Sequence, residues 1–229
     1  MVSPVVLSDA ELTEIRQFDS ATISNAIELL GVRDRTVGYM GLSVRCLLPH
    51  RTEPMVGYAV TAKADSTTYG RSGAGQQIDL WELVERSPKP AILVMQDIST
   101  NPTKSCHCGD VMCTVLQALG GIGVVTDGGV RDVTEVDALG MHYFARGSTV
   151  SHGTTVQIEP GEPVVVDGLP IKTGDLLHGD ANGVVSVPLD AATRVAEAAR
   201  MVVSEENARR EFVRTPGFTV AKFREFLGS

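Results

Sequence analysis

A short charged stretch, residues 126–136 (TDGGVRDVTEV), has the residue types needed to bind an anion beside a metal ion. Arg131 can hold a carboxylate through two parallel hydrogen bonds, and the oxygens of Asp132 are ligands that Mg²⁺ and Mn²⁺ favour. A second carboxylate, Asp110, follows Gly109 at the start of a segment with helical periodicity. This combination suits the binding and polarisation of a small carboxylic acid.

The elements that must position these residues alternate between strand and helix. Apolar runs at 91–97 and 122–126 predict core strands, and the segment between them, 109–121, predicts a helix that ends at a glycine pair. A short helix at 132–140 and a strand at 141–147 are predicted to follow. This alternation predicts a parallel βαβ core with right-handed crossovers.

Ligands of a parallel sheet gather beyond the carboxyl ends of its strands. Three loops of this chain should meet there: the loop 66–70 (STTYG) after a predicted strand at 55–64, the pair 109–110, and the turn 127–132. The helix that begins near Asp110 would direct free backbone N–H groups and the positive end of its dipole at this edge. We therefore expect a carboxylate cradle, a guanidinium and a divalent-metal site in one cleft.

The charged turn has an equally favoured structural interpretation. Asp132 is a good helix N-cap, and a pair between Arg131 and an aspartate could be a surface ion pair that contributes little. Asp127 is expected to tie down the turn, while Gly128 and Gly129 are expected to let the chain turn close to a metal ion. Capping and ligand binding are compatible, because a capping aspartate at this place can still reach a metal.

The remaining segments complete a single domain over residues 1–229. A capping box begins an N-terminal helix near residue 8, and a second helix is predicted within 19–31. Asp-Gly and Asn-Gly pairs predict two antiparallel hairpins, and a long C-terminal helix is predicted for about 189–214. The predicted fold class is therefore α/β, with a parallel core, antiparallel hairpins and a long C-terminal helix.

Composition and charge exclude several functions. The 229 residues carry a net charge of -8, whereas nucleic-acid-binding surfaces are usually basic, so we expect no nucleic-acid partner. No apolar run approaches the roughly 20 residues that cross a membrane, and the N-terminus does not resemble a secretion signal. We expect a cytoplasmic protein without a membrane partner.

Several common catalytic motifs are missing from the sequence. It has no G-x-G-x-x-G fingerprint after a strand, no P-loop and no G-x-S-x-G elbow. The five histidines are scattered, so each is expected at the surface or in the core rather than as a ligand. Cys106, Cys108 and Cys113 lack the paired C-x2-C units of structural zinc sites, so we expect small, buried or half-buried free thiols.

The segment GDVMCTVLQALGGIGVVTDGGVRDVTEV resembles the motif of the class II pyruvate aldolases that cleave 4-hydroxy-4-methyl-2-oxoglutarate. In that family a glycine lies upstream of an Arg-Asp pair and an acid lies just beyond it. Here these residues are Gly109, Arg131, Asp132 and Glu135. FDSATISNAIELLG, GYAVTA and IKTGDLLHGDANGVVSVP also match, so the resemblance covers about residues 18–210. The same family contains the RraA-like regulators of ribonuclease E activity.

The resemblance implies a swivelling β/β/α fold that assembles as a homotrimer or as a hexamer of two trimers, with active sites between subunits. Asp132 would bind the divalent cation, Mg²⁺ or Mn²⁺, directly. Arg131 would bind the 2-oxo acid and steady its enolate, and Asp110 would act through a metal-bound water. The backbone of the first helical turn would hold the substrate carboxylate, at Gly109, Val111 and Met112.

A neighbouring subunit would also contribute to each site. The family places an acid from a neighbour's C-terminal helix there, and Glu206 or Glu205 is the candidate in this chain. The sequence departs from the family at Cys108 and Asp110, where tryptophan and glutamate are usual, and again after Arg214. These departures affect the expected substrate more than the expected metal.

The activity expected from the resemblance is retro-aldol cleavage of a 4-hydroxy-2-oxo acid to pyruvate through a metal-stabilised enolate. Oxaloacetate decarboxylation is an expected side activity, because the same enolate forms when CO₂ leaves. The alternative is a non-catalytic protein that binds and regulates a ribonuclease. The Arg131-Asp132 pair and Asp110 favour the enzyme, and the lack of a nucleotide loop disfavours a methyltransferase.

Overall fold

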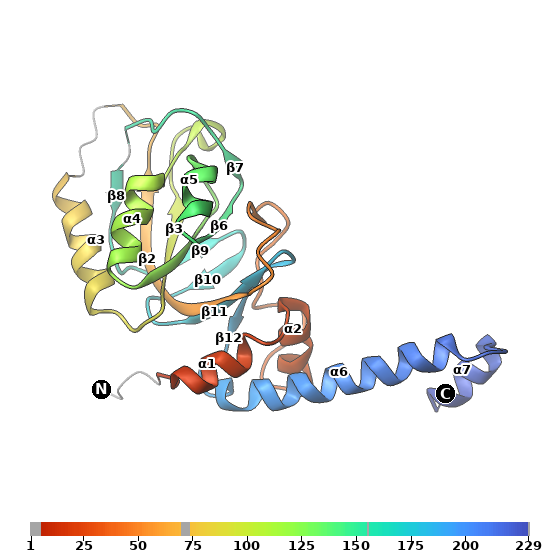
Figure 1. Cartoon of the computed structure of the whole chain (residues 1–229). Helices are drawn as coiled ribbons and strands as arrows, with labels where there is room; N and C mark the ends of the chain where they lie inside the picture. Colours follow the sequence, from red (N-terminus) through yellow and green to blue (C-terminus); the bar gives the residue numbers. More distant parts are fainter. Residues whose placement is uncertain (1–5, 70–73, 155, 229) are drawn as a thin grey trace.

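The computed structural model describes residues 6–69, 74–154 and 156–228 of the chain. Its strands are β1 (Arg45–Cys46), β2 (Met55–Asp65), β3 (Ala91–Asp97), β4 (Gly121–Thr126), β5 (Gly129–Val130), β6 (His142–Ala145), β7 (Gly147–Ser148), β8 (Val156–Ile158), β9 (Val164–Val166), β10 (Leu169–Ile171), β11 (Leu176–Asp180) and β12 (Gly183–Val187). Its α-helices are α1 (Asp9–Ile15), α2 (Ser20–Leu29), α3 (Ala74–Arg86), α4 (Asp110–Ala118), α5 (Val133–Ala138), α6 (Ala192–Arg214) and α7 (Val220–Phe226). A 3-10 turn spans Pro102–Lys104. Figure 1 shows their arrangement.

One mixed sheet of eight strands organises the described part of the chain. Its order is β1-β6-β4-β3-β2-β11-β12, and β8 pairs with β2 outside this path. Strands β2, β3, β4 and β6 run parallel, and α3, α4 and α5 connect each of them to the next. The predicted parallel βαβ core is confirmed. These strands are almost wholly buried because other elements cover both of their faces.

Two apolar clusters lie on opposite faces of the parallel strands. On one face, the strands pack against α3, α4 and α5 through side chains such as Leu93, Leu80, Leu116 and Val136. On the other face, they pack against the β9–β10 hairpin through Ile92, Val94, Phe144, Val164 and Leu169. Fully burying one such side chain stabilises the fold by about 1.5–3 kcal/mol. The resulting layers of hairpin, sheet and helices agree with the expected β/β/α arrangement.

A third cluster joins the two ends of the chain. Helices α1, α2 and α6 pack on the part of the sheet formed by β2, β11 and β12, and α6 also packs along α2. Ser8 begins α1 with the predicted capping box, in which its hydroxyl accepts the Glu11 N–H and Glu11 binds the Ser8 N–H. The buried side chains of this cluster include Ile15, Ile23, Ile27, Tyr58 and Val195.

The two predicted hairpins form, but one of them turns at a different pair. Val166 pairs with Leu169, so Asp167 and Gly168 are the loop, and both have positive φ as a type I′ turn requires. In the second hairpin Asp180 pairs with Gly183, so the loop is Ala181-Asn182 rather than Asn-Gly. Gly183 is instead the first residue of the returning strand.

The C-terminal arm, defined as residues 203–228, extends away from the body of the molecule (Figure 1). No residue of this arm is buried. At its tip α7 folds back on the end of α6, and the ring of Phe212 packs on Phe218, Phe223 and Phe226 at centroid distances of 6.2, 6.1 and 4.4 Å. The sequence analysis predicted α6 but not α7. Among the described helices, none is long and apolar enough to cross a membrane.

Candidate active site

The predicted meeting of the two charged segments is confirmed. Helix α4 begins at Gly109, its N-cap, and the Asp110 N–H donates to Oδ2 of Asp132 at 3.2 Å. The Arg131 N–H donates to the carbonyl of Cys108 at 3.0 Å, which fastens the two loops side by side. The first turn of α4 and the Arg131-Asp132 pair therefore lie together beyond the carboxyl ends of β3 and β4.

Glycine is required at position 109 by this close approach. A Cβ atom there would lie 2.5 Å from Oδ2 of Asp132 and 3.0 Å from Nε of Arg131. The first distance is shorter than real Cβ contacts allow, and the second is tighter than most of them. The Asp132 carboxylate can therefore rest against the start of α4 only because residue 109 has no side chain.

Asp132 is the N-cap of α5 by position but not by hydrogen bonding. Its backbone is left-handed, with φ 56° and ψ 41°, and its carboxylate makes no capping bond to α5. The carboxylate instead accepts the Asp110 N–H and pairs with Nε of Arg131 at 3.2 Å. The capping interpretation of Asp132 is thus wrong for its side chain, because the left-handed backbone turns the carboxylate toward α4. A non-glycine residue in this conformation is strained, and such strain concentrates at functional sites.

A pocket of about 250 Å³ opens at the first turn of α4. Its volume suits a small acid. The side chains of Arg131 and Asp132, 34% and 29% exposed, remain accessible to a ligand. A second hollow, of about 430 Å³, is lined by Arg131, Asp132, Val133, Ser148, Thr149 and Val150. The first pocket is lined by Gln77, Cys106, His107, Cys108, Gly109, Asp110, Val111, Met112, Arg131 and His152.

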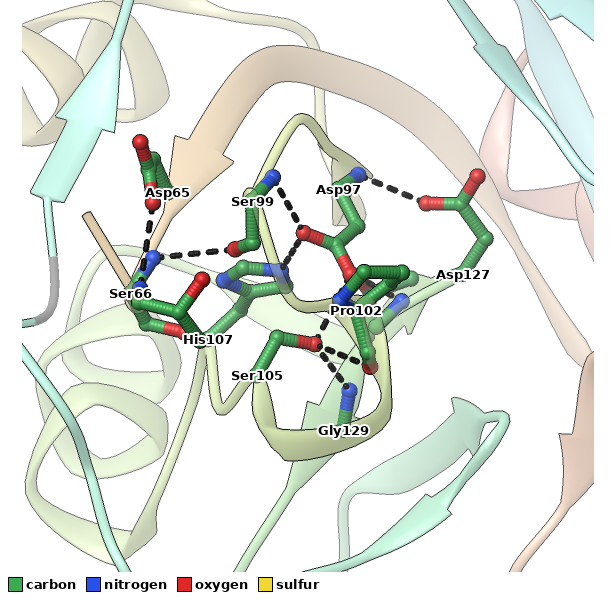
Figure 2. Close-up of polar contacts among 12 residues, drawn as sticks. Asp65, Ser66, Asp97, Ser99, Pro102, Ser105, His107, Asp127 and Gly129 are labelled. Atoms are coloured by element: carbon green, nitrogen blue, oxygen red, sulfur yellow. Dashed lines mark hydrogen bonds and ion pairs between the residues drawn. The ribbon is translucent and has the colours of Figure 1, made fainter.

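A buried polar network lies beneath this edge of the sheet (Figure 2). The Asp97 carboxylate, at the end of β3, accepts the Ser99 N–H and the Ser105 hydroxyl, each at 2.8 Å. Nε2 of His107 lies 3.1 Å from Oδ1 of Asp97. Burial alone would raise the pKa of Asp97, but the contacts from His107 and Ser99 outweigh it and hold this pKa at about 2. Asp97 is therefore an anion at neutral pH.

The glycine pair of the turn gives room to this network. A Cβ on Gly128 would lie 2.3 Å from Cδ2 of His107, and one on Gly129 would lie 2.3 Å from the carbonyl oxygen of Ser105. Both glycines therefore give room to the segment 105–107, and the expectation that they let the chain turn close to a metal ion stays a prediction. Asp127 does tie down the turn, because its Oδ1 accepts the Asp97 N–H at 2.6 Å.

The loop after β2 also reaches the site, as predicted. The hydroxyl of Ser66 accepts the Cys106 N–H at 2.7 Å. Gly70, the last residue of the expected loop, lies outside the described residues. Glu135 is exposed and, in the described part of the chain, makes no hydrogen bond or ion pair with Arg131.

The cysteines are free thiols, as expected. Cys108 and Cys113 occupy the positions just before the N-cap and four residues into α4, where apolar side chains often pack together, and their sulfurs lie 3.6 Å apart. A hydrogen bond with Cys113 and burial both raise the pKa of Cys108 well above its ordinary value. In the described ranges no three His, Cys, Asp or Glu side chains converge to hold a metal ion.

The acids proposed for a neighbouring site do not lie in the pocket of their own chain. Glu206 lies on α6, where it pairs with Arg210 and accepts from Asn25 at 3.4 Å, and Glu205 pairs with Arg209. Figure 1 shows α6 at the far end of the molecule from α4. Within one chain, the structure therefore brings together Arg131, Asp132 and the first turn of α4, but neither glutamate.

Sequence reasoning missed His107 and Asp97. The sequence places His107 two residues before Gly109, and this adjacency was the available signal. The five histidines show no common spacing, so spacing alone does not single out His107. The role of Asp97 depends on contacts with residues that follow it by several positions, which periodicity does not reveal.

The fold and the pocket define the class of protein: an α/β domain with an anion-suited pocket at the carboxyl ends of parallel strands. Comparison with known proteins identifies the family. Residues 20–186 match the RraA-like family, described as aldolase/RraA, and the chain belongs to that family.

Known relatives and structures extend this similarity over nearly the whole chain. A protein of Halalkalibacterium halodurans named "Putative 4-hydroxy-4-methyl-2-oxoglutarate aldolase" is 27% identical over 208 residues, which cover 90% of this chain and 91% of that protein. An uncharacterized protein of Pseudomonas syringae pv. tomato has a TM-score of 0.74 at 24% identity, covering 99% and 98% of the two chains. RraAS2 of Streptomyces coelicolor, an unusual member of the RNase ES inhibitor RraA family, has a TM-score of 0.68 at 24% identity, covering 89% and 97%. These two structures confirm the predicted fold.

Proposed function

We propose that this protein is a divalent-metal-dependent lyase that cleaves a 4-hydroxy-2-oxo acid to pyruvate. The observation that carries the proposal is the junction of the first turn of α4 with Arg131 and Asp132, where Arg131 lines both the pocket at α4 and the hollow that Asp132 lines. The name of the Halalkalibacterium relative agrees with this reaction class. The proposal requires the pocket to bind a carboxylate, to stabilise an enolate and to move a proton.

The first turn of α4 supplies the carboxylate site. The first N–H groups of a helix have no partner within the helix, and the helix dipole makes this end attractive to anions. Gly109, Val111 and Met112 line the pocket at this turn, so their backbone can face the carboxylate of the substrate. The Asp110 N–H is already used by Asp132, which leaves the following N–H groups of the turn for the substrate.

The acids beside this turn fit Mg²⁺ or Mn²⁺. Both ions favour carboxylate oxygens, and Mg²⁺ commonly uses only one or two protein carboxylates. Asp132 would hold the ion because its carboxylate is partly exposed and is not spent on capping α5, and Asp110 would lie beside it. When bound, the ion would act as a Lewis acid toward the 2-oxo group. Zinc fits less well, because it favours cysteine and histidine ligands. Among the described residues, no cysteine or histidine forms a metal-binding cluster with Asp132.

Arg131 and Asp110 would carry the remaining steps. The guanidinium of Arg131 lines the pocket, so it can donate to the oxygen on which negative charge develops as the C3–C4 bond breaks. The carboxylate of Asp110 lines the same pocket and would accept the proton released from the 4-hydroxyl, through a water molecule where needed. Returning that proton to C3 completes pyruvate.

The same arrangement would decarboxylate oxaloacetate, because loss of CO₂ leaves the same enolate. We place Glu206, or Glu205, of a neighbouring copy at the mouth of the pocket, within a homotrimer or a hexamer. The exposed arm that carries these glutamates supports this assignment, since it has no contact with the pocket of its own chain.

The proposal is tested by measuring pyruvate release from 4-hydroxy-2-oxo acids and from oxaloacetate, with Mg²⁺ and with EDTA. Asp132→Ala should lose at least about 100-fold in turnover, the scale expected for losing a group that stabilises transition-state charge. Thr134→Ala is the matched control, because Thr134 is exposed on α5 two residues away, and it should retain full activity. Unchanged turnover in Asp132→Ala would rule out the assigned site.

A wild-type protein that releases no pyruvate from any of these acids would contradict the proposal as a whole. A pull-down from cell lysate then tests the regulator expected as the alternative. Recovery of a ribonuclease, unaffected by Asp132→Ala, would favour that alternative.

A further inference from the structure

We infer that His107, held by Asp97, is a positioning residue that fixes the start of α4 against Asp132. The inference deepens the proposed function and rests on it only for the choice of ligand used as a probe. It concerns a buried histidine that makes no direct contribution to the proposed chemistry. Three observations support it: the way Asp97 is anchored, the way His107 is enclosed, and the short path from His107 to the site.

Asp97 forms hydrogen bonds with several loops at this edge of the sheet. Its carboxylate accepts from Ser99 and Ser105, and its own N–H donates to Asp127 after the neighbouring strand β4. Its side chain is only 3% exposed. An anion fixed by this many donors cannot move freely, so the group that faces it is fixed as well.

His107 faces that anion and is enclosed by backbone. Its side chain is 1% exposed, and Nε2 lies 3.1 Å from Oδ1 of Asp97. The His107 N–H donates to the carbonyl of Gly129 at 2.9 Å, and Gly128 packs directly against the ring. The residue is therefore clamped between the end of β3 and the turn that leads to Arg131 (Figure 2).

The site begins two residues further along the chain. The carbonyl of Cys108 accepts a hydrogen bond from the Arg131 N–H. The next residue, Gly109, lies against the Asp132 carboxylate. This segment is closely packed. A Cβ atom added at Gly109 would lie 2.5 Å from Oδ2 of Asp132. A shift of His107 would consequently move the backbone N–H groups that the proposed function assigns to the substrate carboxylate.

Stability alone does not explain a histidine here. Nδ1 has no hydrogen-bond partner among the described residues, and the contact of Nε2 with Asp97 has an ion-pair distance but not the geometry of a good hydrogen bond. Unpaired polar atoms in a buried site reduce stability, and native proteins keep few of them. A role in placing the functional segment accounts for the residue.

The test compares His107→Leu with His107→Gln. Titration calorimetry with oxalate in the presence of Mg²⁺, well below the unfolding temperature, should show at least tenfold weaker binding for His107→Leu. His107→Gln keeps an N–H donor for Asp97, so it should recover much of the affinity. The matched control is Ile27→Ala, which removes a buried side chain from the cluster between α2 and α6. It should lower the unfolding temperature but leave the oxalate affinity unchanged.

Hydrogen exchange gives a second readout that needs no ligand. In His107→Leu the backbone amides of residues 108–112 should exchange at least tenfold faster, while those of β11 and β12 remain as in the wild type. Equal oxalate affinity in all variants, or exchange that rises uniformly over the chain, would overturn the inference. If the wild-type protein does not bind oxalate, the proposed function fails, and the exchange pattern alone still decides the role of His107.

Discussion

At the scale of single residues, the site depends on a carboxylate and on a residue that lacks a side chain. The left-handed backbone of Asp132 points its carboxylate at α4 instead of capping α5. Gly109 makes room for it. The carboxylate occupies space that a Cβ atom at residue 109 would need, so the two residues depend on each other.

Gly109→Ala should therefore disable the site more than it destabilises the fold. The added Cβ, 2.5 Å from Oδ2 of Asp132, must push the carboxylate or α4 aside. A displacement of about 1 Å can cost roughly 100-fold in rate, so we expect kcat/KM for pyruvate formation to fall by about that factor. Gly147→Ala is the control, since a Cβ there meets no atom within 4 Å. Equal activity of the two variants would contradict this account of Gly109.

At this scale the sequence predicted which residues meet but not how they are held. Arg131, Asp132 and Asp110 could be predicted because residue type and position at strand ends restrict their chemistry. The left-handed φ of Asp132 could not, since this conformation is uncommon for a residue other than glycine and no local pattern marked it here. The Asp97–His107 contact also depends on tertiary packing.

At the scale of elements, the arm formed by the end of α6 and by α7 is unlike the rest of the chain. Four phenylalanines pack together at its tip, yet Phe226 is 42% exposed and none of residues 203–228 is buried. Helix α7 has 7 residues, and isolated helices shorter than about 12–15 residues are marginal in water. The arm is therefore suited to packing against another molecule.

Ending the chain at Thr215 tests this view of the arm. We expect the free energy of unfolding of the body to change by less than about 1 kcal/mol, because the removed residues bury nothing against it. The number of chains per particle, measured by light scattering, should fall if the tip of the arm, residues 216–228, joins copies of the chain. A truncated protein with unchanged mass and a much lower unfolding temperature would show that the arm belongs to the body.

Elements were predicted where a local signal governs them. The Asp167-Gly168 turn forms because both residues accept positive φ, and its flanking strands pair as the pattern requires. The turn at residues 181–182 was misplaced by one residue because Gly183 continues into the strand. Helix α7 was missed because Pro216 and Gly217 suggested the end of structure, although Thr219 caps a new helix by accepting the Lys222 N–H.

At the scale of the whole molecule, a buried histidine ties stability to pH. His178 joins β11 to α2: its Nδ1 lies 2.9 Å from the Ser20 hydroxyl, and its Nε2 lies 3.0 Å from the carbonyl of Phe18. Burial lowers the pKa of His178 from 6.5 to about 4. Protonation would cost the folded state more than the unfolded state, so the neutral ring is favoured by folding.

The free energy of unfolding should therefore decrease as the pH falls from 6.5 to about 4. The unfolded chain takes up the His178 proton near pH 6.5, whereas the folded chain resists it until about pH 4. The loss from this one group is roughly 3 kcal/mol, and full stability is present above pH 6.5. Urea unfolding at a series of pH values would measure it, and His178→Gln should show a shallower slope.

Two other groups also contribute to this profile, Asp97 at lower pH and His142 in the same pH range. Asp97 has its pKa held at about 2, so its contribution is present above pH 3.8 and is lost only as the pH falls through about 2. His142, whose pKa burial also lowers to about 4, remains in the variant and gives the residual slope. An identical slope in wild type and His178→Gln would contradict the assignment to His178.

The α6 helix carries Glu206 away from the pocket of its own chain, and this makes a complementation experiment possible. If a neighbour's pocket uses that glutamate, Arg131→Ala and Glu206→Gln are defects in different halves of a shared site. Two inactive proteins, dissociated and reassembled as an equal mixture, should then complement each other. With random assembly about a quarter of the sites would combine an intact arginine with an intact glutamate, so about a quarter of the wild-type turnover should return. A mixture that stays inactive would show that the two residues do not serve one shared site.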